Sequence, residues 1–205
     1  IRAYIPQSVW DKIKQNYVNQ VGKITIGDPK DFSNFMSAVI DRKSYDNIVG
    51  YIDRASNSNE CEIVTGGSYD DSTGYFVHPT TIVCSNPDYE TMKEEIFGPV
   101  LSIYVYQDHE FKQILTTCDN TSEYALTGSI FATNREDIIT AMNALRYSAG
   151  NFYINDKPTG AVVGQQPFGG ARGSGTNDKA GSPLNLLRWI SPRSIKETFA
   201  PPHDW

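Results

Sequence analysis

Basic residues are not in excess in this sequence, which carries 18 Lys and Arg against 24 Asp and Glu, for a formal net charge of −6. Proteins that bind nucleic acids generally need a cluster of Lys and Arg, because these side chains replace the counterions around phosphates. Long apolar runs are also missing, and a membrane-spanning helix needs about 20 consecutive apolar residues. The sequence therefore predicts neither a nucleic acid nor a membrane as a partner.

Cysteines are few, and Cys61, Cys84 and Cys118 lie far apart without any Cys-x-x-Cys pattern. This number and spacing indicate neither a disulfide framework nor a zinc site, and they favour a reducing compartment. No histidine directly adjoins Cys61 or Cys84 to lower the pKa of the thiol, and Cys118 falls on the apolar side of a predicted helix. We expect all three thiols to be structural, and no metal site in the chain.

What the sequence does contain is typical of a folded domain: 205 residues, of which 39% are hydrophobic and 12% aromatic. This composition is close to the average of globular proteins and supplies enough apolar surface for a core. Residues 1–6 alternate in character like the middle of a strand, without a signal or transit pattern. We therefore expect the chain to begin inside a structural element, with a preceding segment in the natural protein.

Patterns typical of strands and helices alternate along most of the chain. Helical spacing of apolar residues predicts helices over residues 8–21, 44–55, 111–118 and 138–145, and a short helical turn over 90–96. Apolar and β-branched runs predict strands over residues 61–65, 100–106, 126–132 and 151–154. A kinked or edge strand is expected over residues 74–84, because the proline there cannot donate to a ladder. Ser8 with Asp11, and Ser44, are expected to cap the first two helices.

The alternation predicts an α/β fold with a mainly parallel open sheet and helices on both faces. In such sheets, functional residues gather in the loops at the carboxyl ends of the strands. Residues 156–183 break the pattern with a long loop rich in glycine and proline, and loops of this length are commonly functional. The glycines within residues 169–175 match neither the dinucleotide nor the Walker spacing, and they favour an irregular loop.

Residues 93–100 contain two glutamates followed closely by an aromatic side chain. The carboxylate of Glu95 has two oxygens that can accept hydrogen bonds from both hydroxyls of a ribose, and the ring of Phe97 can pack against a flat heterocycle. Paired glutamates before a turn are also common on solvated surfaces. The residues alone leave both interpretations open.

Four motifs together resemble one known family. Residues 94–100, Glu-Glu-Ile-Phe-Gly-Pro-Val, and residues 166–175, Gln-Pro-Phe-Gly-Gly-Ala-Arg-Gly-Ser-Gly, resemble conserved segments of the aldehyde dehydrogenase superfamily. Residues 149–157, Ala-Gly-Asn-Phe-Tyr-Ile-Asn-Asp-Lys, and residues 159–165, Thr-Gly-Ala-Val-Val-Gly-Gln, resemble the branch that acts on glutamate γ-semialdehyde. The resemblance extends over essentially the whole chain.

The resemblance implies a cofactor and a set of binding residues. Glu95 would hold the nicotinamide ribose of NAD, with Phe97 packing nearby. Gly160 and Ala161 would form a loop whose backbone N–H groups bind the α-carboxylate of the substrate; some relatives carry Ser at the position of Ala161. Phe168 would line the aliphatic part of the substrate site. The expected substrate and product are glutamate γ-semialdehyde and glutamate.

The resemblance also implies an organisation and a location. Residues 1–183 would form the catalytic domain without its start, and residues 184–205 an oligomerisation segment and tail. A strand over residues 189–198 would pair with a second copy of the chain or with a partner subunit. The family branch points to the mitochondrial matrix and to the breakdown of proline.

One departure from the family concerns the nucleophile. The family's catalytic cysteine lies in a Gly-Gln-x-Cys motif, which would fall just before Ile1, and none of the three cysteines of this chain takes its place. We therefore expect no catalytic residue in the chain, and a catalytic-domain portion that is inactive by itself, since attack on the aldehyde needs the thiolate. The alternatives are a catalytically dead protein that serves as a structural or binding subunit, and a simple carboxylate-binding module.

Overall fold

The structure is a computed structural model that describes residues 1–158, 161–162, 164–200 and 203. The helices are α1 (Gln7–Val21), α2 (Arg42–Ser56), α3 (Glu90–Lys93), α4 (Phe111–Asn120), α5 (Arg135–Ala144) and α6 (Pro183–Leu186), with 3-10 turns at Asp108–Glu110 and Leu187–Trp189. The strands are β1 (Arg2–Pro6), β2 (Cys61–Thr65), β3 (Tyr69–Asp70), β4 (Phe76–Val77), β5 (Thr80–Cys84), β6 (Val100–Tyr106), β7 (Tyr124–Ala125), β8 (Thr127–Ile130), β9 (Asn151–Ile154) and β10 (Ala171–Arg172).

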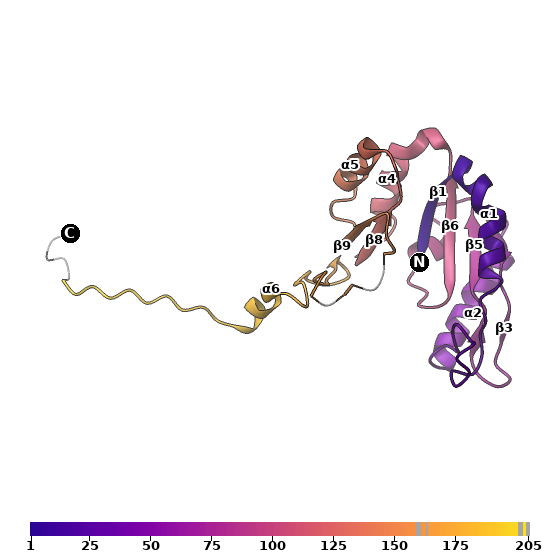
Figure 1. Cartoon of the computed structure of the whole chain (residues 1–205), viewed down its shortest axis with the longest axis horizontal. Coiled ribbons are helices and arrows are strands. Elements are labelled where there is room, and N and C mark those ends of the chain that lie inside the picture. Colours follow the sequence, from indigo (N-terminus) through magenta and orange to yellow (C-terminus); the bar gives the residue numbers. More distant parts are fainter. Residues whose placement is uncertain (159–160, 163, 201–202, 204–205) are drawn as a thin grey trace. The chain divides into compact units, whose positions relative to one another are not determined.

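The chain divides into two units. The first unit consists of Ile1–Glu123 and Asn134–Arg146, and the second of Tyr124–Thr133 and Tyr147–Trp205. Each unit has its own sheet, and each is described separately below (Figure 1).

The first unit is built on a four-stranded sheet in the order β1-β6-β5-β2. β1 and β5 both run parallel to the central β6, and β2 joins the edge antiparallel to β5. The kink expected within residues 74–84 is confirmed, because Pro79 lies between β4 and β5 and removes no donor from either strand. The expected edge position is wrong, since β5 has a neighbour on each side.

Helices cover both faces of this sheet. On one face, Ile82 of β5 packs in the core with Ile48 and Ile52 of α2. The next residue along a strand points to the opposite face. There, Tyr17 of α1 shares a hydrogen bond of 2.7 Å with the hydroxyl of Thr81. The predicted α/β fold with a mainly parallel sheet is confirmed.

Both predicted helix caps differ from the structure. The carboxylate of Asp41 accepts a hydrogen bond of 2.7 Å from the N–H of Ser44, so Asp41 caps α2 and Ser44 lies inside it. Ser8 lies inside α1, and its N–H donates to Asp108 at 3.1 Å rather than completing a capping box with Asp11. Neighbouring short polar side chains are all competent caps, so sequence alone assigns the cap only to within a few residues.

The second unit contains two small sheets. β8 and β9 pair in parallel, and β7 pairs with β10 in the antiparallel sense. The strand predicted over residues 151–154 has those bounds in the structure, and the strand predicted over residues 126–132 is shorter, with β8 ending at Ile130. An isolated antiparallel bridge joins Phe168 to Ala180 and closes part of the long loop on itself.

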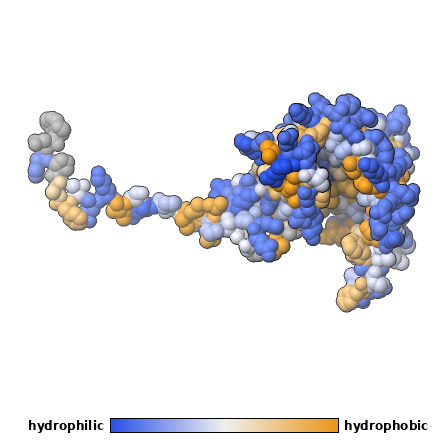
Figure 2. All heavy atoms as spheres, turned by 45° about the horizontal axis from the view of Figure 1, so that its top comes forward, coloured by the Kyte–Doolittle hydropathy of each residue, from blue (hydrophilic) through white to orange (hydrophobic). Residues whose placement is uncertain are grey.

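The carboxyl-terminal segment was expected to pair as a strand with a second copy or a partner subunit, and this single chain does not test that prediction. After α6 and the 3-10 turn that ends at Trp189, residues 190–200 pair with no strand in the part of the chain that the structure describes. Their apolar side chains are exposed, including Ile195 at 77% and Phe199 at 91%. Figure 2 shows this apolar surface in orange along the stretch that leads to the C-terminus. Across the described parts of the chain, no helix combines the length and apolarity that crossing a bilayer requires.

Candidate functional site

The loop between α3 and β6 presents Glu95 and Phe97 to solvent. Phe97 is 85% exposed, and its backbone has φ 57°, a left-handed conformation that a bulky residue rarely adopts. The residue between them, Ile96, is 3% exposed and belongs to the hydrophobic core. Burial of Ile96 thus holds the flanking glutamate and phenylalanine outward, and strained backbone of this kind is concentrated at functional sites.

Gly98 sets how closely this loop approaches the core. A Cβ atom at this position would lie 2.5 Å from Cδ1 of Ile48, which is fully buried in α2. Real Cβ atoms are not found this near to another heavy atom, so only glycine fits here without displacement. The sequence Ile-Phe-Gly therefore works as a unit in which Ile96 anchors the loop, Phe97 projects and Gly98 permits close packing.

The Glu95 and Phe97 pair fits the cofactor expected from the family. Glu95 is exposed, so its carboxylate oxygens are available to two adjacent ribose hydroxyls. Phe97 offers a largely uncovered aromatic face one residue beyond the buried Ile96. An exposed acceptor beside an exposed ring, both on a firmly anchored loop, suits a nucleoside with a flat heterocycle such as the nicotinamide riboside of NAD.

The loop that follows β9 is held by Asn155, which also has a left-handed backbone, with φ 54°. Its side chain accepts a hydrogen bond from the N–H of Ala132 and donates one to the carbonyl of the same residue, both at 2.9 Å. The hydroxyl of Ser129 donates to the carbonyl of Asp156. These bonds fix the start of the loop that follows β9.

The expected carboxylate-binding residues lie just beyond this point. Ala161 is partly exposed, and Gly160 lies outside the described residues. After Ala161 the chain turns back on itself: the N–H of Val162 donates to the side-chain oxygen of Gln166 at 3.1 Å, and the N–H of Gln166 donates to the carbonyl of Val162 at 3.0 Å. Hydrogen bonds of the backbone and of the Gln166 side-chain amide hold this turn, and the chain then continues to Phe168.

The backbone of Phe168 is held by hydrogen bonds, although the residue lies in a loop. Its N–H and carbonyl both bond to Ala180, at 2.8 and 2.7 Å. On either side, the buried side chain of Asn151 donates to the carbonyl of Pro167 at 3.1 Å and accepts from the N–H of Gly169 at 3.2 Å. Asn151 therefore brackets Phe168, whose side chain stays 38% exposed and available to a ligand.

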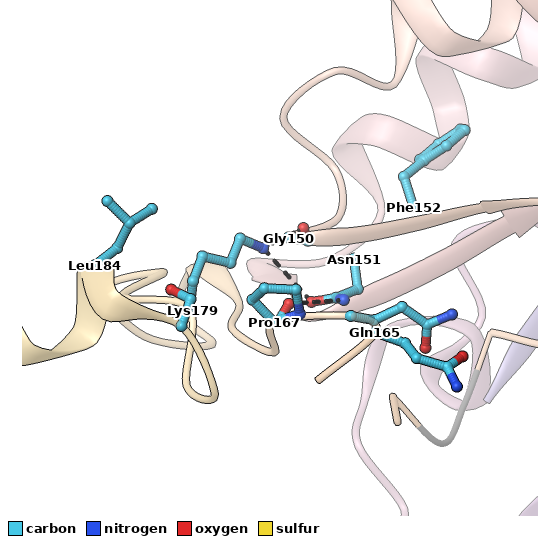
Figure 3. A pocket seen from close by; sticks show the side chains of 9 residues that line it. Gly150, Asn151, Phe152, Gln165, Pro167, Lys179 and Leu184 are labelled. Carbon is cyan, nitrogen blue, oxygen red and sulfur yellow. Dashed lines mark hydrogen bonds between the residues drawn. The ribbon is translucent and has the colours of Figure 1, made fainter. Parts of the chain in front are cut away.

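Lys179 reinforces the same arrangement, as Figure 3 shows. Its ammonium group donates to the carbonyl of Gly150 at 2.5 Å, and it lies 3.4 Å from the carbonyl of Gly169 and 3.5 Å from the side-chain oxygen of Asn151. Burial lowers the pKa of Lys179. The lysine thus joins the start of β9 to the loop that carries Phe168.

A cavity of about 420 Å³ adjoins this cluster. It is open on one side and is lined by the start of β9, residues 165–167, Lys179, Ser182 and Leu184. The buried hydroxyl oxygen of Ser182 has no hydrogen-bond partner among the described residues. The cavity lies beside the segment that precedes Phe168, within the second unit.

The structure distributes the sequence-predicted residues over the two units. Glu95 and Phe97 share one loop of the first unit, and Ala161 and Phe168 lie in the second unit. Asn151 and Lys179 position Phe168. Sequence analysis identified neither of them, because both act through contacts with residues distant in the chain. Asn155 could have been suspected, since asparagine tolerates a left-handed backbone at the end of a strand.

The three cysteines are free thiols in environments that disfavour the thiolate. Burial raises the pKa of Cys61 and of Cys118, and it raises the pKa of Cys84 to about 12. Within the described residues, no group of three or more His, Cys, Asp and Glu side chains is placed to hold a metal ion.

Comparison with known proteins establishes the class. A family model described as "Aldehyde dehydrogenase family" matches residues 1–195. The chain belongs to the aldehyde dehydrogenase family.

Within that family, the similar proteins include several named Delta-1-pyrroline-5-carboxylate dehydrogenase. The chain is 61% identical over 98% of its length to the mitochondrial Delta-1-pyrroline-5-carboxylate dehydrogenase of Dictyostelium discoideum, and 51% identical over its full length to that of Homo sapiens. Each comparison covers 36% of the relative, so the chain spans about a third of the length of these relatives. The NAD-bound crystal structure of the Delta-pyrroline-5-carboxylate dehydrogenase from Mycobacterium tuberculosis superimposes with a TM-score of 0.87 and 51% identity, over 99% of this chain and 37% of that one.

Proposed function

We propose that this chain is the catalytic-domain portion of a dehydrogenase that oxidises L-glutamate γ-semialdehyde to L-glutamate with NAD, in the breakdown of proline. The observation that carries the proposal is the identity of 61% and 51% to dehydrogenases of that branch, over 98% and 100% of this chain. Coverage of the whole chain at this level leaves no part of it unaccounted for by the family.

The cofactor side of the proposal rests on the loop between α3 and β6. Glu95 would accept hydrogen bonds from the hydroxyls of the nicotinamide ribose, and Phe97 would pack beside the ring. NAD, when bound, accepts a hydride from the substrate. The part of this chain is to orient the ribose, and the anchoring of the loop through Ile96 supports that role because a rigid contact loses little entropy on binding.

The substrate side rests on the loop after β9. Backbone N–H groups at Gly160 and Ala161 would bind the α-carboxylate of the substrate, since small residues allow a ligand to approach the backbone closely. Phe168 would contact the aliphatic carbons. Support comes from the hydrogen bonds of Asn155, which hold the start of this loop, and from those that bracket Phe168.

The chain alone is proposed to be inactive. Oxidation of an aldehyde in this family needs a thiolate nucleophile. The raised pKa of Cys61, Cys84 and Cys118 makes each of them a poor source of thiolate at neutral pH. The nucleophile would belong to the Gly-Gln-x-Cys segment expected before Ile1.

The remaining features of the proposal concern assembly and location. Residues 184–205 would form an oligomerisation segment, in which residues 189–198 pair as a strand with a second copy or a partner subunit. The exposed apolar side chains of this segment, among them Trp189 at 80%, support the proposal because such side chains gain by being covered. The mitochondrial matrix is proposed from the names of relatives such as that of Dictyostelium discoideum.

The test compares two polypeptides in an assay of NADH production with glutamate γ-semialdehyde. The product of the complete coding sequence around this chain should be active, and the 205-residue chain should not. In the active polypeptide, Glu95→Gln should raise the KM for NAD, and Phe168→Ala should raise the KM for the aldehyde about tenfold or more. Gly50→Ala, in α2 at a partly exposed position, serves as the control and should change neither.

Two results would contradict this proposal. Turnover by the 205-residue chain at a rate near that of the longer polypeptide would show that the nucleophile lies within it. A native polypeptide that is encoded as 205 residues and forms no NADH would instead favour the second candidate, a catalytically dead structural or binding subunit. The raised thiol pKa values are the observation in favour of that candidate.

A further inference from the structure

Two cysteines that lie far apart in the sequence face each other across the first sheet. Cys61 of β2 and Cys84 of β5 are direct partners in the antiparallel register. Their sulfur atoms are 3.8 Å apart, although the residues are 23 positions apart in the chain. This contact follows from the pairing of β2 with β5.

The position of the pair in the ladder suits a covalent bond. The N–H of Ser85 donates to the carbonyl of Glu60 at 2.9 Å, so the Glu60 and Ser85 pair is hydrogen-bonded and the neighbouring Cys61 and Cys84 pair is not. Opposed residues at a non-hydrogen-bonded site have Cα atoms about 4.5 Å apart and side chains that approach closely. That separation lies within the range of about 4.4–6.8 Å that a disulfide spans.

The two thiols differ in access. Cys84 is 1% exposed and lies 3.7 Å from the hydroxyl of Thr91 on α3, whereas Cys61 is only partly buried at the edge strand. A small oxidant from solvent would therefore meet Cys61 first. Cys84 would then be in place as the resolving thiol, since its sulfur already touches that of Cys61.

We propose that Cys61 and Cys84 form an oxidisable dithiol site, which an oxidant of the peroxide class converts into a cross-strand disulfide. The sulfur of Cys61 attacks one oxygen of hydrogen peroxide, the O–O bond breaks, and a sulfenic acid and one water are formed. The sulfur of Cys84 then attacks that of Cys61, the S–O bond breaks, and the proton of the Cys84 thiol leaves with the hydroxide as a second water. Two thiols and one peroxide thus give one disulfide and two waters.

The disulfide would fasten the edge of the sheet. β2 joins the sheet only through β5, so a bond between Cys61 and Cys84 ties the edge strand to the interior of the sheet. It also closes the hairpin-like segment that contains β3 and β4, which restricts the unfolded chain. The oxidised protein should therefore unfold at a higher temperature than the reduced protein.

The rate of oxidation should rise with pH. Burial raises the pKa of Cys61, and it raises the pKa of Cys84 to about 12, so only a small fraction of either thiol is ionised at neutral pH. Because the thiolate is the reactive form, the rate of oxidation should increase as the pH is raised from neutral into the alkaline range. The site would respond slowly near neutral pH and faster in a more alkaline compartment.

The experiment treats the reduced 205-residue chain with hydrogen peroxide, quenches free thiols, and measures the intact mass and the linked peptides. The wild type and Cys118→Ser should each lose about 2 Da, with a peptide that joins Cys61 to Cys84. Cys61→Ser and Cys84→Ser should not lose this mass, and in both the unfolding temperature should no longer rise on oxidation.

The matched control is Cys118→Ser, which removes a thiol from α4 and leaves the pair intact. Linkage of Cys118 to either partner, linkage between two chains, or the absence of any internal disulfide in the wild type after complete reaction of Cys61 would overturn the proposal. Should Cys84→Ser fail to fold, the linked peptide of the wild type decides the matter by itself, since it identifies the bonded residues directly.

Discussion

Replacing Gly98 by alanine is expected to destabilise the first unit by about 2 kcal/mol and to displace the loop that carries Glu95 and Phe97. The added Cβ would lie 2.5 Å from Cδ1 and 2.7 Å from Cγ1 of Ile48. Ordinary contacts between carbon atoms are about 3.5–4.0 Å, so one group must move by about 1 Å. Ile48 is fully buried in the hydrophobic core, where side chains are closely packed.

The size of the expected loss of stability follows from the cost of displacing Ile48. Forcing Ile48 away from its preferred rotamer costs about 0.5–1.5 kcal/mol, and extra atoms in a packed core cost about 1–3 kcal/mol in total. A value of about 2 kcal/mol changes the ratio of folded to unfolded protein about 30-fold. The φ of Gly98 lies outside the left-handed region, so alanine adds no backbone strain and the effect measures packing alone.

The matched control is Gly50→Ala in α2, two residues from Ile48. There the new Cβ would meet only the end of the Arg54 side chain, at 3.2 Å, which can move aside. This substitution should stabilise the chain by about 0.5–1 kcal/mol, because glycine is unfavourable inside a helix. The same replacement of glycine by alanine is thus expected to lower the stability at position 98 and to raise it at position 50.

The assay is equilibrium unfolding in urea, followed by the fluorescence of Trp10, which is 5% exposed in the first unit. The other two tryptophans are replaced by Phe in every variant. Ile48→Val removes Cδ1 and should cost about 1 kcal/mol alone. Combined with Gly98→Ala, it should cost less than the sum, by about 1 kcal/mol. An unchanged free energy for Gly98→Ala, or simple additivity in the double variant, would refute the argument from close packing.

Substitutions at three residues, Asn155, Lys179 and Phe97, test the positioning of the candidate site. Asn155→Ala should lower the stability of the second unit by about 2 kcal/mol, since it loses two hydrogen bonds and places alanine at φ 54°, and Asn155→Gly should recover part of this loss in a thermal melt. Lys179→Met should speed hydrogen exchange of the amides around Phe168, whereas Lys157→Met, on an exposed side chain, should leave it unchanged. Phe97 has φ 57°, so Phe97→Asn should be more stable than the wild type and Phe97→Val less stable. Equal stability of the three proteins in urea would contradict the strained backbone.

Much of the first sheet and its helices could be predicted from periodicity. The strand over residues 100–106 has those bounds in the structure, and the helix predicted over residues 44–55 lies within α2; in the second unit, the strand over residues 151–154 also has its predicted bounds. The position of β5 inside the sheet could not be predicted, because the proline before it resembles a breaker in sequence and only the pairing of β5 with β2 and β6 shows that no ladder bond is lost.

The sequence by itself determined the family and the residue types of the candidate site, because the motifs around Glu95 and Phe168 are long and specific. The tertiary structure alone decided how those residues are presented. The outward, left-handed Phe97 depends on the burial of Ile96 in a core assembled from distant helices and strands.

The same division applies to the residues that sequence analysis judged ordinary. Cys61 and Cys84 are unremarkable in the sequence and become neighbours only through the register of β2 with β5. Lys179 and Asn151 meet because the long loop folds back on β9. Local patterns determine which elements form, but contacts between residues far apart in the chain depend on strand pairing and packing, which no local pattern specifies.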